Sequence, residues 1–284
     1  MIRYYGRNAW LTRIPSMITN RIRTMVSAWK VNPYTRWQAA DHRNLAYDRL
    51  ATQVAELAGY EILGGPYKGM KYFDANGVPI VDRLPTTKFV GSFEEELHPW
   101  LESLISSGIR KVVHIGGNEG YHAVGMALRI PESTTVVFDT LIPARKACKT
   151  LAKQNGIQDR IQLRGFCGTE GMLDIDLDGA LVFSDCGGAE LTILDPLLYP
   201  QLKKATILVE THDAFDERIT PRLRSRFNTS HRIEFRSAVQ RDPSSYSFLN
   251  AFPESMGRMA VDERRSLTKE GKPQTWALLR PYPS

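Results

Sequence analysis

The sequence predicts an α/β protein built on a doubly wound, mostly parallel sheet of seven strands, with an antiparallel strand pair at its C-terminal end. Three observations support this prediction. From residue 110 to residue 213, β-prone and helical stretches alternate, which is the pattern of a parallel sheet with right-handed crossovers. A glycine-rich turn directly follows the first apolar run. The last two β-prone runs are joined by a stretch without a convincing helical pattern.

The first 85 residues are predicted to form a basic arm and a cap, and residues 86–284 the main α/β domain. Residues 1–40 contain seven Lys and Arg and no acid, whereas the whole chain carries +6, so the remainder carries −1. Tyr and Trp lie among these cations, and such an arm could hold RNA, a lipid surface or an acidic ligand. A packing arm, or a contact between copies in a homo-oligomer, is the favoured interpretation.

The cap is expected to begin with a helix over about 41–58, because apolar residues recur there at helical spacing. Glycines and an Asn-Gly pair then separate short β-prone runs, which predicts one or two small hairpins over 61–81. A second amphipathic helix over 92–109 leads into the sheet, and Glu94 is expected on its solvated face.

The main domain is expected to alternate strands and helices in a regular order. Five parallel strands are predicted over 111–116, 134–140, 160–167, 179–186 and 205–213. The helices between them are predicted over 119–130, 143–156 and 190–204. Two further strands, over 231–240 and 274–281, are expected to form an antiparallel hairpin at the edge of the sheet.

Cysteine usage and hydropathy exclude several classes of protein. The three cysteines, Cys148, Cys167 and Cys186, are odd in number and widely spaced, which argues against a disulfide framework and against a zinc site. No stretch approaches the roughly 18 apolar residues that span a bilayer. The N-terminus also lacks an uninterrupted apolar region of the kind found in signal peptides. The sequence therefore predicts a soluble, cytoplasmic protein without a membrane span.

The glycine turn has the spacing G-x-x-x-G, from Gly116 to Gly120. A dinucleotide fingerprint would need glycine two and five positions after Gly116, where this chain has Asn118 and Tyr121. That mismatch disfavours a NAD-dependent oxidoreductase. Asp139 closes the second strand 19 residues after Gly120, where a carboxylate can accept hydrogen bonds from both hydroxyls of a ribose.

The chain resembles class I S-adenosylmethionine-dependent methyltransferases, and within them the FkbM-like group of O-methyltransferases. The resemblance covers residues 86–284 and rests on "VVHIGGNEGY", on the stretch that starts "VVFDTLIPARK", on "DCGGAE" and on the terminal strand pair. It implies a Rossmann-like fold and S-adenosyl-L-methionine as cofactor. Two residues depart from the family pattern: His114 stands where an acid usually ends the first strand, and Gly187 replaces a glutamate.

The resemblance also implies which residues contact the cofactor. Asp139 would hold the ribose hydroxyls, and Asp185 would lie near the methionine end. The remaining implied contacts are Gly116, Gly117 and Gly120 on the methionine and ribose side, and Phe166, Cys167 and Gly168 beside the adenine. For Cys167, a role as a buried apolar filler is an equal alternative.

Candidate chemistry lies at the ends of the fourth and fifth strands. Asp185, Glu210 and Asp213 could form an oxygen-rich site for Mg²⁺ or another hard divalent cation. Alternatively, Glu210 hydrogen-bonds locally while Asp213 opens the next helix. His212 is the first candidate for a general base, since its ordinary pKa of about 6.5 suits proton transfer at neutral pH. His122 is the second candidate, with a purely structural role favoured.

The favoured function is methyl transfer to a hydroxyl of a small molecule, sugar or natural product. A nucleic acid partner is disfavoured, because nitrogen methyltransferases typically carry Asn or Asp followed by Pro-Pro and an aromatic residue after strand four. This chain has Asp-Cys-Gly-Gly there. Two alternatives stay open: an RNA or other nitrogen methyltransferase, and a non-catalytic protein that binds S-adenosylmethionine.

Overall fold

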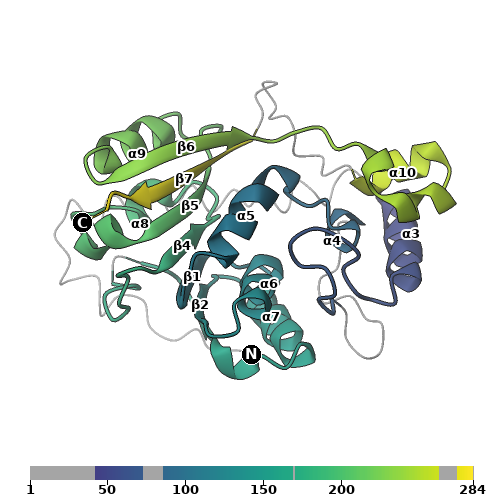
Figure 1. Cartoon of the computed structure of the whole chain (residues 1–284), viewed down its shortest axis with the longest axis horizontal. Coiled ribbons are helices and arrows are strands. Elements are labelled where there is room, and N and C mark those ends of the chain that lie inside the picture. Colours follow the sequence, from purple (N-terminus) through teal and green to yellow (C-terminus); the bar gives the residue numbers. More distant parts are fainter. Residues whose placement is uncertain (1–41, 73–85, 169, 262–273, 284) are drawn as a thin grey trace, which may run out of the picture. The chain divides into compact units, whose positions relative to one another are not determined.

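The computed structural model describes residues 42–72, 86–168, 170–261 and 274–283. The chain divides into two compact units, Met1–Leu45 and Ala46–Ser284, and nearly all described residues belong to the second. The basic arm at 1–40, with its predicted partners, lies outside the described residues, as does the end of the predicted hairpin region. The second unit contains the sheet and the helices that cover it (Figure 1).

The sheet has seven strands in the order β3-β2-β1-β4-β5-β7-β6. Strands β1 to β5 are parallel to one another, whereas β7 lies antiparallel between β5 and β6. The predicted doubly wound, Rossmann-like fold with an antiparallel C-terminal pair is therefore confirmed. The bounds are β1 Lys111–Ile115, β2 Thr134–Phe138, β3 Ile161–Arg164, β4 Leu181–Ser184, β5 Thr206–Thr211, β6 His231–Ser237 and β7 Thr275–Pro281.

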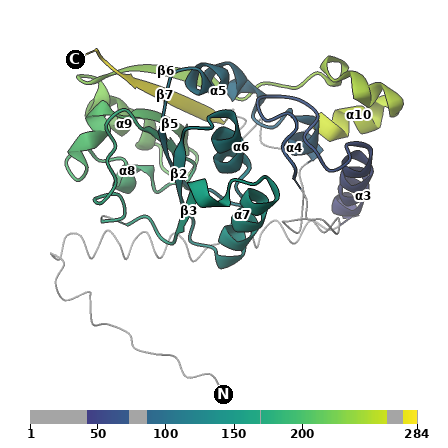
Figure 2. The ribbon, with the colours of Figure 1, turned by 60° about the horizontal axis from the view of Figure 1, so that its bottom comes forward.

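Helices cover both faces of this sheet. Figures 1 and 2 show α5, α6 and α7 on one face and α8 and α9 on the other. Their bounds are α5 His98–Ile105, α6 Tyr121–Arg129, α7 Ile142–Gln154, α8 Glu190–Ile193 and α9 Ile219–Phe227. The central strands are buried on both faces, which explains why β1, β4 and β5 read as near-continuous apolar runs.

The segment before the sheet packs into the same hydrophobic core as the sheet. Helix α3, His42–Leu57, matches the helix predicted over 41–58, and α4 spans Thr86–Val90. Tyr67 and Tyr72 are almost completely buried and belong to the core that also includes residues of β4 and β5. In the described part of the region predicted to form hairpins, the chain has turns and one isolated antiparallel bridge, between Glu61 and Lys71.

Three helical predictions need correction. The helix predicted over 92–109 begins later, at His98, after a 3-10 turn at Glu95–Leu97. The stretch 190–204 forms the short α8 and a 3-10 turn rather than one long helix, because Pro196 and Pro200 interrupt it. The connection between β6 and β7 contains a helix, α10 (Glu254–Val261), whose apolar side packs near α4.

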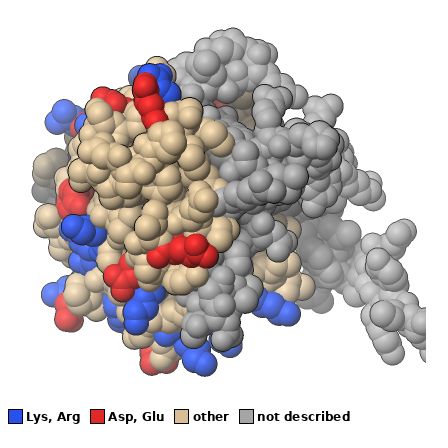
Figure 3. Space-filling view, turned by 90° about the vertical axis from the view of Figure 1, so that its right-hand side faces the viewer, with Lys and Arg blue, Asp and Glu red and all other residues tan. Residues whose placement is uncertain are grey.

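A shallow pocket opens between α3 and α10. It is lined by Gln53, Glu56, Leu57, Phe252 and Met256. Figure 3 shows this side of the molecule, where much of the described surface is neither acidic nor basic. None of the helices in the described ranges is both long and apolar enough to cross a membrane.

Candidate functional site

The polar residues of the candidate site come from the carboxyl ends of neighbouring strands. The chain runs outward from β1 to β3 on one side and from β4 to β5 on the other, so the sheet has a switch point between β1 and β4. Ligands of open parallel sheets bind beyond the carboxyl ends of the strands at such a point. The glycine turn after β1 and the segment after β4 meet there.

The glycines of the turn are required by close packing. Gly116 has a φ of +82°, and a Cβ on it would lie 1.7 Å from the carbonyl oxygen of Asp185. A Cβ on Gly120 would lie 2.6 Å from the Sγ of Cys148 on α7, and one on Gly117 would overlap a valine of β2. Gly116 is part-exposed, whereas Gly117 and Gly120 are buried, so Gly116 is the member of this turn that a ligand can reach.

Asp139 lies directly after β2 and faces the glycine turn. One carboxylate oxygen accepts a hydrogen bond from the backbone N–H of Asn118 at 2.8 Å, and the other accepts from Leu141 N–H at 2.7 Å. Burial raises the pKa of Asp139, while these two bonds oppose that change. A carboxylate oxygen can accept a second hydrogen bond, so the side chain is oriented and still able to accept one from a ligand.

Large apolar side chains are exposed after β2 and after β3. Leu141 is 49% exposed and Ile142 59% exposed after β2, and Phe166 is 54% exposed after β3. Cys167 is buried, and burial raises the pKa of its thiol to about 12, which fits the alternative of an inert filler. The carbonyl of Gly168 accepts a hydrogen bond from Tyr199 Oη at 2.7 Å and fixes this loop.

The structure brings together Asp185, Glu210 and His212 at the ends of β4 and β5. One ligand atom from each lies within 4.8 Å of the others. The Nε2 atom of His212 is 3.5 Å from Asp185 Oδ1 and 3.4 Å from Glu210 Oε2. Glu210 and His212 share this side because alternate residues of a strand point the same way.

A third carboxylate, that of Glu190, contacts the other ring nitrogen. Its Oε1 is 2.7 Å from Nδ1 of His212, and its side chain is fully buried. Burial by itself would lower the pKa of His212, but Glu210, Glu190 and Asp185 outweigh it and raise the pKa to about 10. His212 is therefore already protonated at neutral pH when no cation is bound, and it is not the neutral base that its ordinary pKa suggests.

Asp213 is engaged elsewhere. Its carboxylate accepts hydrogen bonds from the backbone N–H of Thr220 at 2.9 Å and from the hydroxyl of the same residue at 2.6 Å. These bonds tie the loop after β5 to the first turn of α9. The three residues that lie together are therefore Asp185, Glu210 and His212, and not Asp185, Glu210 and Asp213 as predicted. The contacts of Asp213 match the alternative prediction, in which this residue opens the next helix.

A buried ion pair that the sequence did not indicate lies beneath the glycine turn. The ammonium of Lys88 contacts the Glu119 carboxylate, and both side chains are almost completely buried. Tyr72 donates a hydrogen bond to the same carboxylate oxygen at 2.6 Å. Burial alone would raise the pKa of Glu119, but Lys88 and Tyr72 outweigh burial and lower it, which favours the ionised carboxylate.

A second buried network involves His122 at the start of α6. Tyr67 Oη lies 3.0 Å from His122 Nδ1, and Glu94 Oε2 lies 2.7 Å from His122 Nε2. Burial and the nearby Lys88 lower the pKa of His122 to about 3, so a neutral ring accepts from Tyr67 and donates to Glu94. Both nitrogens are occupied, which supports the structural role. Glu94 is buried, at 3% exposure, and not on a solvated face as expected.

His114 takes the position where the family pattern has an acid. The ring stacks on Phe183 with centroids 4.6 Å apart, and burial lowers its pKa to about 3, so it is neutral. Its Nδ1 atom has no hydrogen-bond partner among the described residues.

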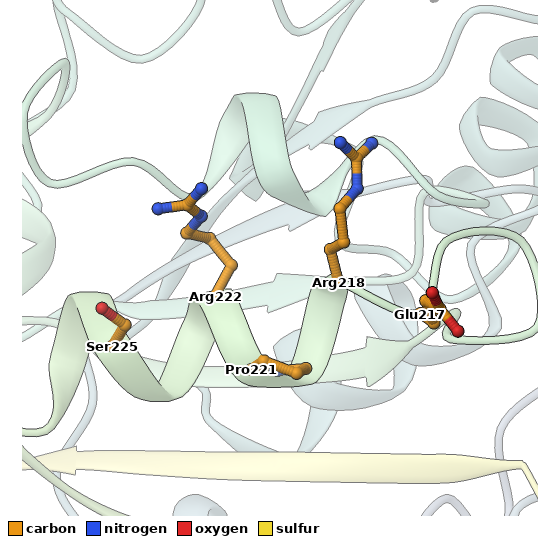
Figure 4. Close-up of a pocket in the computed structure, with 5 residues that line it drawn as sticks. All are labelled: Glu217, Arg218, Pro221, Arg222 and Ser225. Atoms are coloured by element: carbon orange, nitrogen blue, oxygen red, sulfur yellow. The ribbon is translucent and has the colours of Figure 1, made fainter.

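A further pocket lies on α9, away from this group of residues. Figure 4 shows it, with the Arg218 and Arg222 side chains extending from the same side of the helix. The Arg218 guanidinium pairs with Asp216 at 2.6 Å and is exposed. None of the residues lining this pocket is a predicted site residue.

Comparison with known proteins gives matches of fold only. No protein-family model matches the chain, and no curated protein matches it. Among solved structures, an O-methyltransferase from Bacillus cereus in complex with SAH is 14% identical, with 90% of this chain and 99% of that chain covered and a TM-score of 0.43. An S-adenosylmethionine-dependent methyltransferase from Geobacter sulfurreducens in complex with S-adenosyl-L-homocysteine is 17% identical, covering 67% and 91%, with a TM-score of 0.43.

A third match is precorrin-6y C5,15-methyltransferase from Geobacter metallireducens, at 10% identity, 64% and 87% coverage and a TM-score of 0.42. These three structures are of methyltransferases, but similarities this low say nothing about the activity of this chain. Its function has to be inferred from its own residues.

Proposed function

We propose that the protein is an S-adenosylmethionine-dependent methyltransferase that acts on a hydroxyl of a small molecule, sugar or natural product. The observation that carries this proposal is the position of Asp139. Its carboxylate is held by two backbone N–H groups at the end of β2, opposite the part-exposed Gly116 of the turn after β1. This is the place where a nucleoside ribose binds in sheets of this kind.

The residues around Asp139 suit the rest of a nucleoside. Exposed Leu141, after β2, and exposed Phe166, after the neighbouring strand β3, offer apolar surface for a flat base. On the neighbouring strand β1, His114 has a buried nitrogen without a partner among the described residues, and its neutral ring can accept a hydrogen bond from an ammonium group. An acid at this position would also attract the ammonium group by its charge. We therefore expect this chain to bind the methionine end of S-adenosylmethionine more weakly than a chain with an acid in place of His114.

S-adenosylmethionine, when bound, supplies an electrophilic methyl group on a sulfonium. The chain would orient the acceptor oxygen in line with it and keep water away. A hydroxyl must lose its proton as it attacks. Asp185, 32% exposed at its side chain, is the carboxylate of the strand-end group that such a hydroxyl can reach most readily. His212 could take the proton only after losing its own, because its pKa is raised to about 10.

Calorimetric titration with S-adenosylhomocysteine tests the proposal directly. Binding by the parent protein, no binding of NAD, and a large loss of affinity in Asp139→Ala are expected. Asp195→Ala is a suitable control because Asp195 pairs with Arg226 on the opposite face of the sheet from α7. If the parent protein does not bind S-adenosylhomocysteine, or if Asp139→Ala binds it as tightly as the parent, the assignment is wrong.

The acceptor can be sought by incubating the protein with methyl-labelled S-adenosylmethionine and panels of hydroxylated small molecules, glycans and RNA. Label transfer to a hydroxyl compound is expected. Transfer to RNA alone would favour the nitrogen methyltransferase alternative, and binding without transfer to any class would favour a non-catalytic binding protein.

A further inference from the structure

The group at the ends of β4 and β5 contains a nitrogen ligand as well as carboxylates. We propose that Asp185, Glu210 and the Nε2 atom of His212 form a mixed nitrogen and oxygen site for a divalent transition cation, with Mn²⁺, Fe²⁺ and Zn²⁺ preferred over Mg²⁺, and that Glu190 orients the imidazole. The cation's part in methyl transfer rests on the proposed function, whereas the binding site itself does not.

The spacing of the atoms fits ligands around one ion. Nε2 of His212 is 3.5 Å from Asp185 Oδ1 and 3.4 Å from Glu210 Oε2. Hydrogen bonds between nitrogen and oxygen are shorter, about 2.7–3.2 Å. Two ligand atoms that are each about 2.1 Å from a four-coordinate cation lie roughly 3.4 Å apart. The separations are thus too long for direct hydrogen bonds and suit a shared metal ion.

Glu190 supplies a second, independent observation. Metal-binding histidines usually donate their other ring N–H to a carboxylate, which fixes the tautomer and the ring orientation. The contact of 2.7 Å between Glu190 Oε1 and Nδ1 of His212 has this form, and it directs Nε2 toward the two carboxylates. Glu190 is fully buried, and its Oε2 has no hydrogen-bond partner among the described residues.

The donor set determines the class of cation. Mg²⁺ prefers oxygen ligands only, whereas an imidazole nitrogen suits first-row transition ions. An all-oxygen site would need Asp213, but both oxygens of that carboxylate bind Thr220. Three protein ligands leave at least one position for a water or an acceptor oxygen. This free coordination position would face outward, on the side of Asp185, because the Asp185 side chain is 32% exposed while that of Glu210 is 2% exposed.

Cobalt absorption and calorimetry on the chelator-treated protein test the site without any activity measurement. The parent protein should bind one Co²⁺ with visible d–d bands and bind Mg²⁺ at least about tenfold more weakly. His212→Asn should weaken Co²⁺ binding by about tenfold or more and change the bands. Glu190→Gln should weaken it by about 10–100-fold, because the support of the ring is lost.

Two further variants serve as controls that should keep the Co²⁺ affinity of the parent protein. Glu217→Gln, on an exposed residue of the same loop region, should bind Co²⁺ like the parent. Asp213→Asn should also keep its Co²⁺ affinity. The proposal is overturned if the parent binds no Co²⁺, if it prefers Mg²⁺, or if His212→Asn binds Co²⁺ as tightly as the parent. Should His212→Asn fail to fold, Glu190→Gln and His212→Gln decide the same question.

The failure of this site and the failure of the proposed function are distinguishable. S-adenosylhomocysteine binding is measured on the same metal-free samples. A protein that binds Co²⁺ as described but no S-adenosylhomocysteine keeps the cation site and loses the methyltransferase assignment. Cofactor binding without cation binding overturns the cation site alone.

Discussion

The backbone of Gly116 passes so close to Asp185 that a Cβ at residue 116 would lie 1.7 Å from the Asp185 carbonyl oxygen. This contact joins the turn after β1 to the segment after β4 across the switch point of the sheet. The two halves of the candidate site are therefore held at a fixed separation by backbone packing, and glycine is needed there whether or not a ligand is bound.

Gly116→Ala is expected to destabilise the protein strongly. The left-handed φ of +82° adds strain on the order of 1–3 kcal/mol, and the overlap with the Asp185 carbonyl adds more. Gly179→Ala is the matched control, because its φ is +65° and a Cβ there meets nothing within 4 Å. Urea unfolding should show a clearly larger loss for Gly116→Ala, and equal losses would contradict the packing explanation.

Removal of one partner of the Lys88–Glu119 ion pair should be costly. A buried charge left without its partner destabilises a protein by about 3–5 kcal/mol. We expect such a loss for Lys88→Met and for Glu119→Gln, and a loss in the double variant well below the sum of the two. Lys204→Met, in an exposed pair with Asp178, is the control and should change the unfolding midpoint little. Additive losses would show that the two buried residues do not interact.

Stability should fall on mild acidification. Burial holds the pKa of His114 and His122 at about 3, below the ordinary value of 6.5. Below pH 6.5 the unfolded chain takes up protons that the folded protein does not, so the stabilising contribution is complete above that pH and is lost progressively toward pH 3. Each histidine contributes a slope of up to about 1.4 kcal/mol per pH unit.

His114→Phe tests this dependence, because phenylalanine can keep the stacking on Phe183 but cannot be protonated. Between pH 6.5 and pH 5, its free energy of unfolding should fall less steeply than that of the parent. Denaturant titrations at several pH values measure both slopes. Identical slopes would mean that His114 is protonated in the folded state as readily as in the unfolded state.

Asp213→Ala should reduce stability moderately. The side chain accepts two hydrogen bonds from Thr220 in the first turn of α9, and loss of such a cap typically costs about 1 kcal/mol. Hydrogen exchange should show faster opening of α9, while the amides of β1 stay protected. Unchanged exchange in α9 would indicate that these bonds do not hold the helix.

The sequence allowed the sheet to be predicted because its central strands are apolar runs and its outer strands β3 and β6 alternate apolar and polar residues. It did not predict α10, although this helix is amphipathic, because its eight residues are fewer than the roughly 11–18 over which helical periodicity is recognised. The buried ions Lys88 and Glu94 were also missed, because a charged residue that is buried with a partner looks the same in sequence as one on a solvated surface.

Strand geometry alone could have predicted that Asp213 does not join Glu210. In an extended strand, residues 210 and 212 point to one side and residue 213 to the other. The structure also separates Asp213 from Glu210 and His212, although β5 ends at Thr211 and Asp213 lies in the turn that follows. The contact between Glu190 and His212 could not be foreseen in this way, because it depends on how the short α8 folds back beside β5.

The place of β7 in the sheet has a consequence for biosynthesis. This strand is made last, yet it lies between β5 and β6 and is the neighbour through which β6 joins the sheet. While the chain is still emerging from the ribosome, β5 has an open edge and β6 has no place to dock. A product shortened before residue 275 would keep both strands exposed for pairing with other chains, so loss of this short segment should cause aggregation rather than mild destabilisation.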